Sequence, residues 1–196
     1  MTAVLRSRAY NCAMHTTTPQ DIVHFWYAAE MRAKWFASTP SVDAMIRERY
    51  EPVWESAQLG ALRHWRNNSA DCLALVIVLD QFPLNMFRGT VKSFSTMQQA
   101  IAVTKQAIAQ GFDLLIDKAQ VAFLYMPLMH SEDLADQDLS VALFETAGLE
   151  NNLRFARHHR EIVHRFGRFP HRNAILGRTS SAEESAYLAS KKTFAR

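Results

Sequence analysis

Cysteine is scarce in this chain of 196 residues, which has thiols only at Cys12 and Cys72. Neither belongs to a Cys-x-x-Cys pair, so the sequence predicts neither a disulfide framework nor a zinc ribbon. Cys72 stands in an apolar run, where a thiol is typical of a small buried side chain. Because free thiols persist in reducing compartments, we expect the protein to be cytoplasmic.

Apolar runs are short. The longest, CLALVIVL at residues 72–79, is too short to cross a bilayer, so we expect a soluble protein with no membrane partner. Residues 1–18 have no apolar core and therefore do not form a secretory signal, although their lack of acids leaves a transit peptide as an alternative. We expect residues 1–17 to be a flexible N-terminus and residues 18–196 to form a single α-helical domain.

Glycine and proline number only six each, and the formal net charge is +3. That composition is ordinary for a globular protein and includes no low-complexity segment. The charge is too small to indicate nucleic acid by itself, so we do not expect a nucleic-acid partner. The sequence also lacks a P-loop, a GxGxxG fingerprint and a nucleophile elbow, and we expect no cofactor.

Most segments have the apolar spacing of amphipathic helices, with suitable residues at their ends. Pro19 fits the first position of a helix, and Gly60, Gly111 and Gly167 fit left-handed positions just after helix ends. The two overlapping Ser/Glu pairs of SSAEE, residues 180–184, predict a capping box. The expected helices begin at Pro19, cover 46–57, 69–81, 97–108, 121–129, 131–148 and 151–166, and begin again near Ser181.

Prolines predict two interruptions. Pro52 lies inside the apolar stripe of 46–57 and should kink or break that helix. Pro83 should stop the helix that Ser69 caps. The β-branched run at 76–78 leaves a buried strand as the alternative there, but no partner strand is apparent elsewhere.

About eight helices with short links predict an all-α fold of stacked antiparallel helix pairs. The charges of two neighbouring segments are opposite: residues 113–150 carry eight acids and one base, whereas residues 151–178 carry seven arginines and one acid. Since consecutive helices pack side by side, we expect these segments to face each other. An anion-binding surface is the alternative.

The stretch LDQFPLNMFRG, residues 79–89, places Asp80 at the end of an apolar helix. A carboxylate there meets the negative end of the helix dipole, at a cost of about 0.3–1 kcal/mol, and an unpaired buried charge is more costly still. Asp80 therefore needs a cation or several donors, and Arg88 or an arginine of 165–178 are the candidates. The stretch is either a buried Asp–Arg clamp between helix pairs or part of a site.

The stretch PLMHSEDLADQ, residues 127–137, has Ser131 as a helix cap followed by Glu132 in the first turn. Capping does not explain His130. A His-x-Glu motif without Pro-Cys-x-x-Cys does not indicate a zinc deaminase. Glu161 and His164 form only half of a di-iron motif, and Glu161 is spaced to pair with the arginines four residues before and after it, so we expect no metal site.

The most basic stretch is HRFGRFPHRNAILGR, residues 164–178, which has four arginines, two histidines and no acid. Arg168, His171 and Arg172 could present planar donors to a carboxylate or phosphate. The alternative is that the same arginines reach the acidic helix, Asp80 or helix carbonyls. Just before this stretch, the apolar face expected for helix 151–166 consists of Phe155, His159, Ile162 and Phe166.

The motif stretches 79–89, 123–137 and 165–178, together with HFWY and KWF near the N-terminus, resemble the bacterial family called domain of unknown function nine-two-four. The resemblance covers nearly the whole chain beyond residue 20. It implies a right-handed superhelix similar to tetratricopeptide-repeat proteins and implies no reaction. The family usually reads LDQFPRN, whereas this chain has Leu84 in place of that arginine, and it has Ala28 where a glycine is usual.

We expect the polar residues of these stretches to converge on one pocket that binds an anionic small molecule or peptide. One alternative is a small enzyme for an anionic metabolite, in which His130 or His171 transfers protons with help from Glu132. A second alternative is that the motifs only lock the fold. The candidate site residues are Asp80, Gln81, Asn85, Arg88, His130, Glu132, Arg168, His171, Arg172 and Asn173.

Overall fold

A computed structural model describes residues 17–190, and this part of the chain is all-α, with no strand. The prediction of a flexible N-terminus falls almost entirely on residues 1–16, outside the described residues. The α-helices are α1 (Pro19–Tyr27), α2 (Ala29–Arg32), α3 (Pro40–Gln58), α4 (Ser69–Val76), α5 (Phe82–Met86), α6 (Met97–Ala109), α7 (Lys118–His130), α8 (Leu134–Thr146), α9 (Glu150–Phe166) and α10 (Ala182–Ala189). Between them lie the 3₁₀ turns η1 (Arg63–Asn67), η3 (Val91–Phe94), η4 (Phe112–Leu115) and η5 (Pro170–Arg172), and the π turn η2 (Ile77–Gln81).

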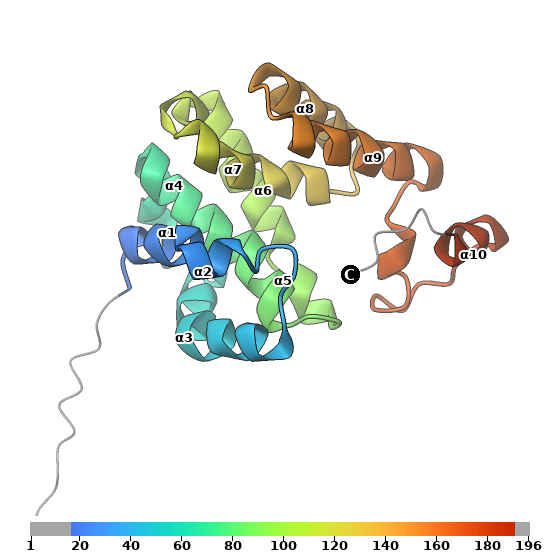
Figure 1. The fold of residues 1–196 in the computed structure, drawn as a ribbon, viewed down its shortest axis with the longest axis horizontal. Coiled ribbons are helices and arrows are strands. Elements are labelled where there is room, and N and C mark those ends of the chain that lie inside the picture. The colour runs from blue at the N-terminus through green and yellow to red at the C-terminus, as the bar shows by residue number, and fades with distance from the viewer. Residues whose placement is uncertain (1–16, 191–196) are drawn as a thin grey trace, which may run out of the picture.

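The core is built around α4 and η2, whose residues 72–79 are all buried. Helices α1, α6 and α7 contact α4, and α3 contacts η2. Helices α1–α3 lie on one side of the molecule and α8–α9 on the other (Figure 1). The helical stretch Ser69–Met86 is long and apolar enough to cross a membrane, but 78% of it is buried inside the protein. Its position at the centre of the helices explains its apolar composition.

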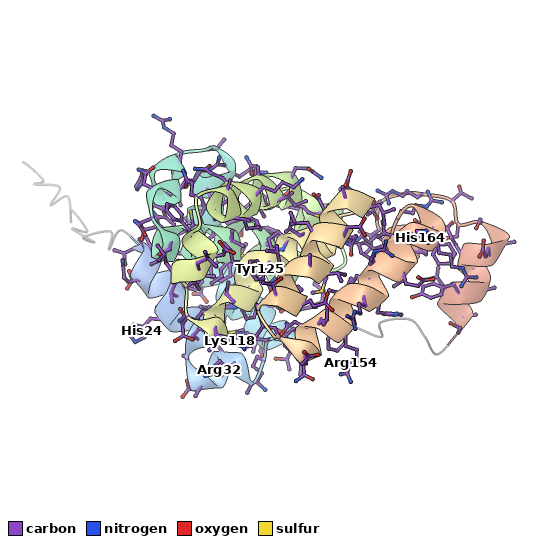
Figure 2. The ribbon with its side chains drawn as sticks, turned by 90° about the horizontal axis from the view of Figure 1, so that it is seen from above. His24, Arg32, Lys118, Tyr125, Arg154 and His164 are labelled. Carbon is purple, nitrogen blue, oxygen red and sulfur yellow. The ribbon has the colours of Figure 1, made fainter. Side chains whose placement is uncertain are left out.

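Helices α6, α7, α8 and α9 pack against one another in chain order, with α8 and α9 in the most extensive contact. Helix α10 lies beyond the C-terminal end of α9, the end near His164 and away from Arg154 (Figure 2). A second, small apolar cluster of Ile162, Val163 and Phe169 joins this region. The all-α fold is thus confirmed, whereas the tetratricopeptide-like superhelix stays a prediction.

Neither proline breaks its helix. Helix α3 continues through Pro52, because the carbonyl left without its partner belongs to exposed Glu48, where water can bind it. Helix α4 is followed directly by the π turn η2 and then by α5, so the helical path continues past Pro83. The π turn before it, with the Phe82 amide bonded to the Ile77 carbonyl, shifts the hydrogen-bond register ahead of the residue that has no N–H.

Two predicted caps are wrong by one or two positions. Asn68, and not Ser69, caps α4 by accepting a hydrogen bond from the Asp71 amide at 3.0 Å. Asp133, and not Ser131, caps α8. Ser131 instead ends α7. The predicted helix start at Pro19 is confirmed, as is the capping box at Ser181, which pairs with Glu184.

The apolar face of α9 differs from the prediction. Phe155 is 45% exposed, and the buried face consists of Leu153, Ala156, Ile162 and Val163. The expected contact between acidic and basic segments is confirmed in part. Two arginines of α9 pair with acids of α8, in the ion pairs Arg157–Glu145 and Arg160–Asp138.

Candidate functional site

Asp80 and His130 form a buried pair between η2 and the last residue of α7. His130 Nδ1 lies 3.0 and 3.1 Å from the two carboxylate oxygens of Asp80. His130 is only 8% exposed and Asp80 only 3%. Gln81 donates to the same carboxylate from Nε2, at 2.5 Å. Asp80 therefore has the donors that the sequence required, but they are an imidazole and an amide, not an arginine.

The π turn explains how two successive polar residues reach the interior. Asp80 and Gln81 are the last residues of η2, and both are buried. A π turn widens the helix by one residue per turn and changes the direction of the side chains that follow. His130 is placed by α7, whose residues 123–130 are all buried.

The hydrogen bond to Asp80 determines the protonation pattern of His130. A carboxylate accepts, so Nδ1 carries a proton. Nε2 makes no hydrogen bond to any residue in the described part of the chain. In the neutral ring this nitrogen accepts a hydrogen bond, and in the protonated ring it donates one.

Arg172 joins this pair from η5, far along the chain. Its Nη2 donates to the His130 carbonyl oxygen at 2.9 Å, and its Nη1 lies 3.6 Å from the sulfur of Met97. The guanidinium lies over two aromatic rings, 4.9 Å from the centroid of Phe94 and 4.5 Å from that of Phe169. These contacts hold a buried, planar cation beside His130.

A small pocket lies among these side chains, and we call it the Asp80–His130 pocket. Its volume is about 10 Å³, which is room for about one water molecule. The His130 side chain is 11% exposed, so the pocket opens to solvent. Its lining residues are Leu79, Asp80, Leu84, Ser93, Phe94, Met97, His130 and Arg172.

Arg88 and Asn85 do not join the pocket. Arg88 binds Asp43 of α3 with Nε and Nη2, at 2.7 and 3.1 Å, and this hydrogen bonding raises the pKa of Arg88. Asn85 accepts from Arg88 at 2.9 Å and donates to the Gln81 carbonyl at 2.8 Å. Arg88 lies beyond the end of α5 on the side of α3, so it cannot neutralise Asp80.

Glu132 is also turned away from His130. Its carboxylate accepts from the Phe169 amide at 2.9 Å and binds Arg178 at 2.9 Å. The chain becomes extended at Ser131, which directs Glu132 toward the loop that follows α9. The prediction that Glu132 assists a histidine is therefore wrong, and Asp80 occupies that position.

Arg168 and Asn173 hold α10. Arg168 binds Glu184 through Nε and Nη2, at 2.7 and 2.9 Å, and these hydrogen bonds, with one from the Ser181 amide, lower the pKa of Glu184 to about 2. Asn173 donates to Ser180 at 3.0 Å. His171 is exposed, with its ring 5.5 Å from that of Phe169. Of the ten predicted residues, Asp80, His130 and Arg172 line the Asp80–His130 pocket, and Gln81 binds Asp80 beside it; the other six are not among its lining residues.

The ion pairs within α9 are also different from those predicted. Arg157 and Arg165, each four residues from Glu161, bind Glu145 and Glu183 instead. Among residues 17–190, no three His, Cys, Asp or Glu side chains are grouped so that they could hold a metal ion.

His159 is a neighbour of this site that sequence reasoning assigned only to an apolar face. Its ring lies 5.4 Å from that of Phe169, and its Nδ1 donates to the Phe155 carbonyl at 2.8 Å. The pKa of His159 is lowered to about 3, chiefly by burial; the positive charges of His130, His158 and Arg172 act in the same direction, and the hydrogen bond to the Phe155 carbonyl acts against them. No local spacing in the sequence could have revealed this position, because Phe169 and Arg172 come from a later turn.

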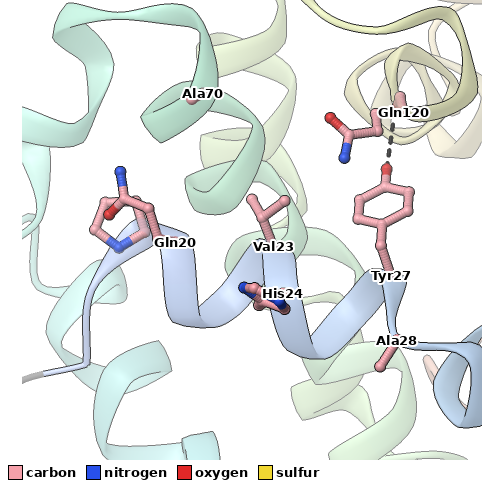
Figure 3. A pocket seen from close by; sticks show the side chains of 8 residues that line it. Gln20, Val23, His24, Tyr27, Ala28, Ala70 and Gln120 are labelled. Atoms are coloured by element: carbon pink, nitrogen blue, oxygen red, sulfur yellow. Dashed lines mark hydrogen bonds between the residues drawn. The ribbon is translucent and has the colours of Figure 1, made fainter.

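A larger groove lies elsewhere, between α1 and the first turns of α4 and α7 (Figure 3). It has a volume of about 490 Å³. Tyr27 closes one end by donating to the Gln120 carbonyl at 2.9 Å. The lining is Pro19, Gln20, Val23, His24, Tyr27, Ala28, Ala70 and Gln120. Since these are mostly uncharged side chains, the groove lacks the convergent charged groups of the Asp80–His130 pocket.

Comparison with known proteins identifies the family. The family described as "Bacterial protein of unknown function (DUF924)" matches residues 22–192. The chain is also similar to a solved structure of a protein of unknown function, ATU0120, from Agrobacterium tumefaciens. The two are 37% identical with a TM-score of 0.83, over 87% of this chain and 96% of that one. No match was found among curated proteins. The chain therefore belongs to the DUF924 family of bacterial proteins of unknown function.

Proposed function

We propose that the protein binds the anionic end of a small molecule or peptide in the Asp80–His130 pocket. The observation that carries this proposal is a buried carboxylate–imidazole pair beside a buried guanidinium, Asp80 with His130 and Arg172. A protonated His130 offers Nε2–H, and Arg172 offers a fixed planar cation. Hydrogen bonds from such charged donors to a carboxylate or phosphate oxygen are about twice as strong as those between neutral groups.

The size of the pocket limits what enters. A volume of about 10 Å³ admits little more than one oxygen atom, so the remainder of the ligand lies outside, over the half-buried Leu84 and Met97. Arg172 is already held by Phe94, Phe169 and the His130 carbonyl. A cation that is ordered before binding loses little freedom when the ligand arrives, which favours affinity.

The second candidate is an enzyme in which His130 transfers protons. It is supported by the same pair, because a buried carboxylate that binds Nδ1 orients an imidazole for acid–base chemistry at Nε2. In this version Asp80, and not Glu132, assists the histidine. His171, the other histidine expected to transfer protons, is exposed, and its ring lies 5.5 Å from that of Phe169.

The binding proposal is tested by NMR titration of isotopically labelled protein with acetate and with inorganic phosphate, in a buffer free of other anions. We expect the Hε1 resonance of His130 to shift with at least one anion, and Arg172→Gln to abolish the shift. Arg157→Gln, at an exposed pair on α9, is the matched control and should bind normally. If neither anion moves the resonance, and Arg172→Gln only lowers the melting temperature, the motifs lock the fold and the proposal is wrong.

The enzyme candidate requires a further step. Any organic anion that binds is incubated with the protein and followed for chemical conversion. Loss of a general acid or base lowers turnover by about 10²–10⁴-fold, so His130→Gln should abolish conversion while Arg157→Gln does not. Binding without conversion would leave the first candidate alone.

Two further expectations, the superhelical arrangement of the helices and the cellular location, belong with this proposal. The packing of α6, α7, α8 and α9 in chain order supports a tetratricopeptide-like superhelix. The thiol of Cys72 is free and buried, and burial raises its pKa to about 11. A free thiol without a partner supports a cytoplasmic location.

A further inference from the structure

Ser93 is a polar side chain in the wall of the Asp80–His130 pocket. It belongs to η3 and is only 5% exposed. Its hydroxyl donates to the Thr90 carbonyl at 2.6 Å, so the one hydrogen of this group is already used. Within residues 17–190 no group donates a hydrogen bond to Ser93 Oγ. Ser93 therefore offers the pocket a hydrogen-bond acceptor and not a donor.

Two other lining residues bring acceptors to the same pocket. The Asp80 carboxylate binds His130 Nδ1 and Gln81 Nε2, and a carboxylate has about four acceptor positions in all. His130 Nε2 accepts a hydrogen bond when the ring is neutral and donates one when the ring is protonated. An oxygen atom that enters the pocket therefore meets acceptors on Ser93 and Asp80 in either state of the ring.

A hydroxyl oxygen fits these acceptors better than an oxygen without a hydrogen. The pocket volume of about 10 Å³ has room for about one oxygen atom. A hydroxyl can donate to Ser93 Oγ while it accepts from protonated His130, and it can donate to Nε2 when the ring is neutral. A carboxylate or sulfate oxygen can only accept, so it would leave the Ser93 acceptor without a partner, which is costly in a buried site.

We infer, on the basis of the proposed anion binding, that the ligand is inorganic phosphate, whose P–OH oxygen enters the pocket and donates to Ser93 Oγ. Hydrogen phosphate keeps a hydrogen on one oxygen at neutral pH, whereas sulfate and carboxylates do not. A phosphate monoester loses its last hydrogen with a pKa of about 6, so it resembles sulfate above that pH. The other oxygens of hydrogen phosphate lie outside the pocket.

The test compares anions of the same shape. At pH 8 hydrogen phosphate and sulfate are both tetrahedral and carry the same charge, and they differ by one hydrogen. Methyl phosphate at the same pH has the phosphate group without that hydrogen. Affinities are measured from the shift of the His130 Hε1 resonance. We expect phosphate to bind at least about fivefold more tightly than sulfate or methyl phosphate, because each of these leaves a buried acceptor without a partner.

Two serine substitutions separate the pocket from the turn that forms it. Ser93→Ala removes the acceptor and should lower the ratio of phosphate to sulfate affinity at least about twofold. Ser95→Ala is the matched control, because Ser95 is exposed and makes the same kind of hydrogen bond, to the Lys92 carbonyl at 2.8 Å. Ser95 does not line the pocket, so this variant should keep the wild-type ratio. Circular dichroism checks that both variants fold.

The outcomes distinguish this inference from the proposal beneath it. If phosphate, sulfate and acetate all fail to shift the His130 resonance, anion binding itself is wrong. If anions bind, but phosphate and sulfate bind equally, the phosphate inference is overturned and anion binding stands. A preference for phosphate that Ser93→Ala leaves unchanged contradicts the hydrogen bond to Ser93. If Ser93→Ala does not fold, the wild-type affinities for phosphate, sulfate and methyl phosphate decide the inference.

Discussion

Lowering the pH should destabilise this protein through His159 before its carboxylates are protonated. Burial lowers the pKa of His159 to about 3 in the folded state, from the ordinary value of 6.5. Between these two values the unfolded chain binds a proton that the folded chain does not. The free energy of unfolding therefore falls as the pH falls, and the contribution of the neutral ring is fully present only above pH 6.5.

The size of the effect follows from the two pKa values. One proton taken up only by the unfolded chain changes the free energy of unfolding by about 1.4 kcal/mol per pH unit. Between pH 8 and pH 5 the expected loss is about 2 kcal/mol, since the slope is small above pH 6.5. His159 is half-buried, and water that reaches the ring screens its charge, so this is an upper value.

Urea denaturation at a series of pH values measures this loss. His159→Gln removes the titrating ring and should flatten the curve between pH 8 and pH 5. His164→Gln, at an exposed position of the same helix, is the matched control and should keep the wild-type slope. A variant His159→Gln that loses as much stability on acidification as the wild type would refute the assignment to this residue.

Three further predictions concern the contacts around the pocket. Asp80→Asn should lower the free energy of unfolding by about 1–3 kcal/mol, because it replaces the buried carboxylate that accepts hydrogen bonds from His130 and Gln81; an unchanged urea midpoint would contradict the pairing with His130. Phe169→Ala should cost about 3–5 kcal/mol, since this ring is fully buried and holds Arg172, whereas Phe155→Ala at an exposed site should cost less than about 0.5 kcal/mol; equal losses would place both rings in the core. Glu184→Gln should lower the melting temperature at neutral pH more than Glu183→Gln does. It should also remove part of the stability that the wild type loses between pH 4.5 and pH 2, because the Glu184 carboxylate, with its lowered pKa, is stabilising above pH 4.5 and becomes protonated near pH 2. If the variant loses as much stability on acidification as the wild type, the ion pair between Glu184 and Arg168 does not stabilise the fold.

Much of the fold could be predicted from the sequence because the signals are local. Apolar residues at helical spacing predicted the helices, and Pro19 and Ser181 marked helix starts that the structure confirms. The opposite charges of neighbouring segments predicted the ion pairs between α8 and α9. These features depend on residues within a few turns of one another, or on helices that follow directly in the chain.

The site could be predicted only in part. The need of Asp80 for a donor follows from its place in an apolar helix, but the donor itself is His130, 50 residues away. Selecting it over Arg88 requires knowing which side of the α4–α5 helix faces α7. That side is set by the π turn before Pro83. No spacing of residues in the sequence predicts this turn.

The sequence by itself determined which residues are apolar, where most helices begin and end, and that Asp80 needs a partner. Only the tertiary structure decided that Arg172 lies beside His130 and that Leu84 lines the pocket. It also decided that Glu132 accepts a hydrogen bond from the Phe169 amide and pairs with Arg178. The physical reason is range. Helix formation and capping depend on hydrogen bonds within about four residues, whereas a pocket depends on how separate helices pack, which every buried side chain of the core determines together.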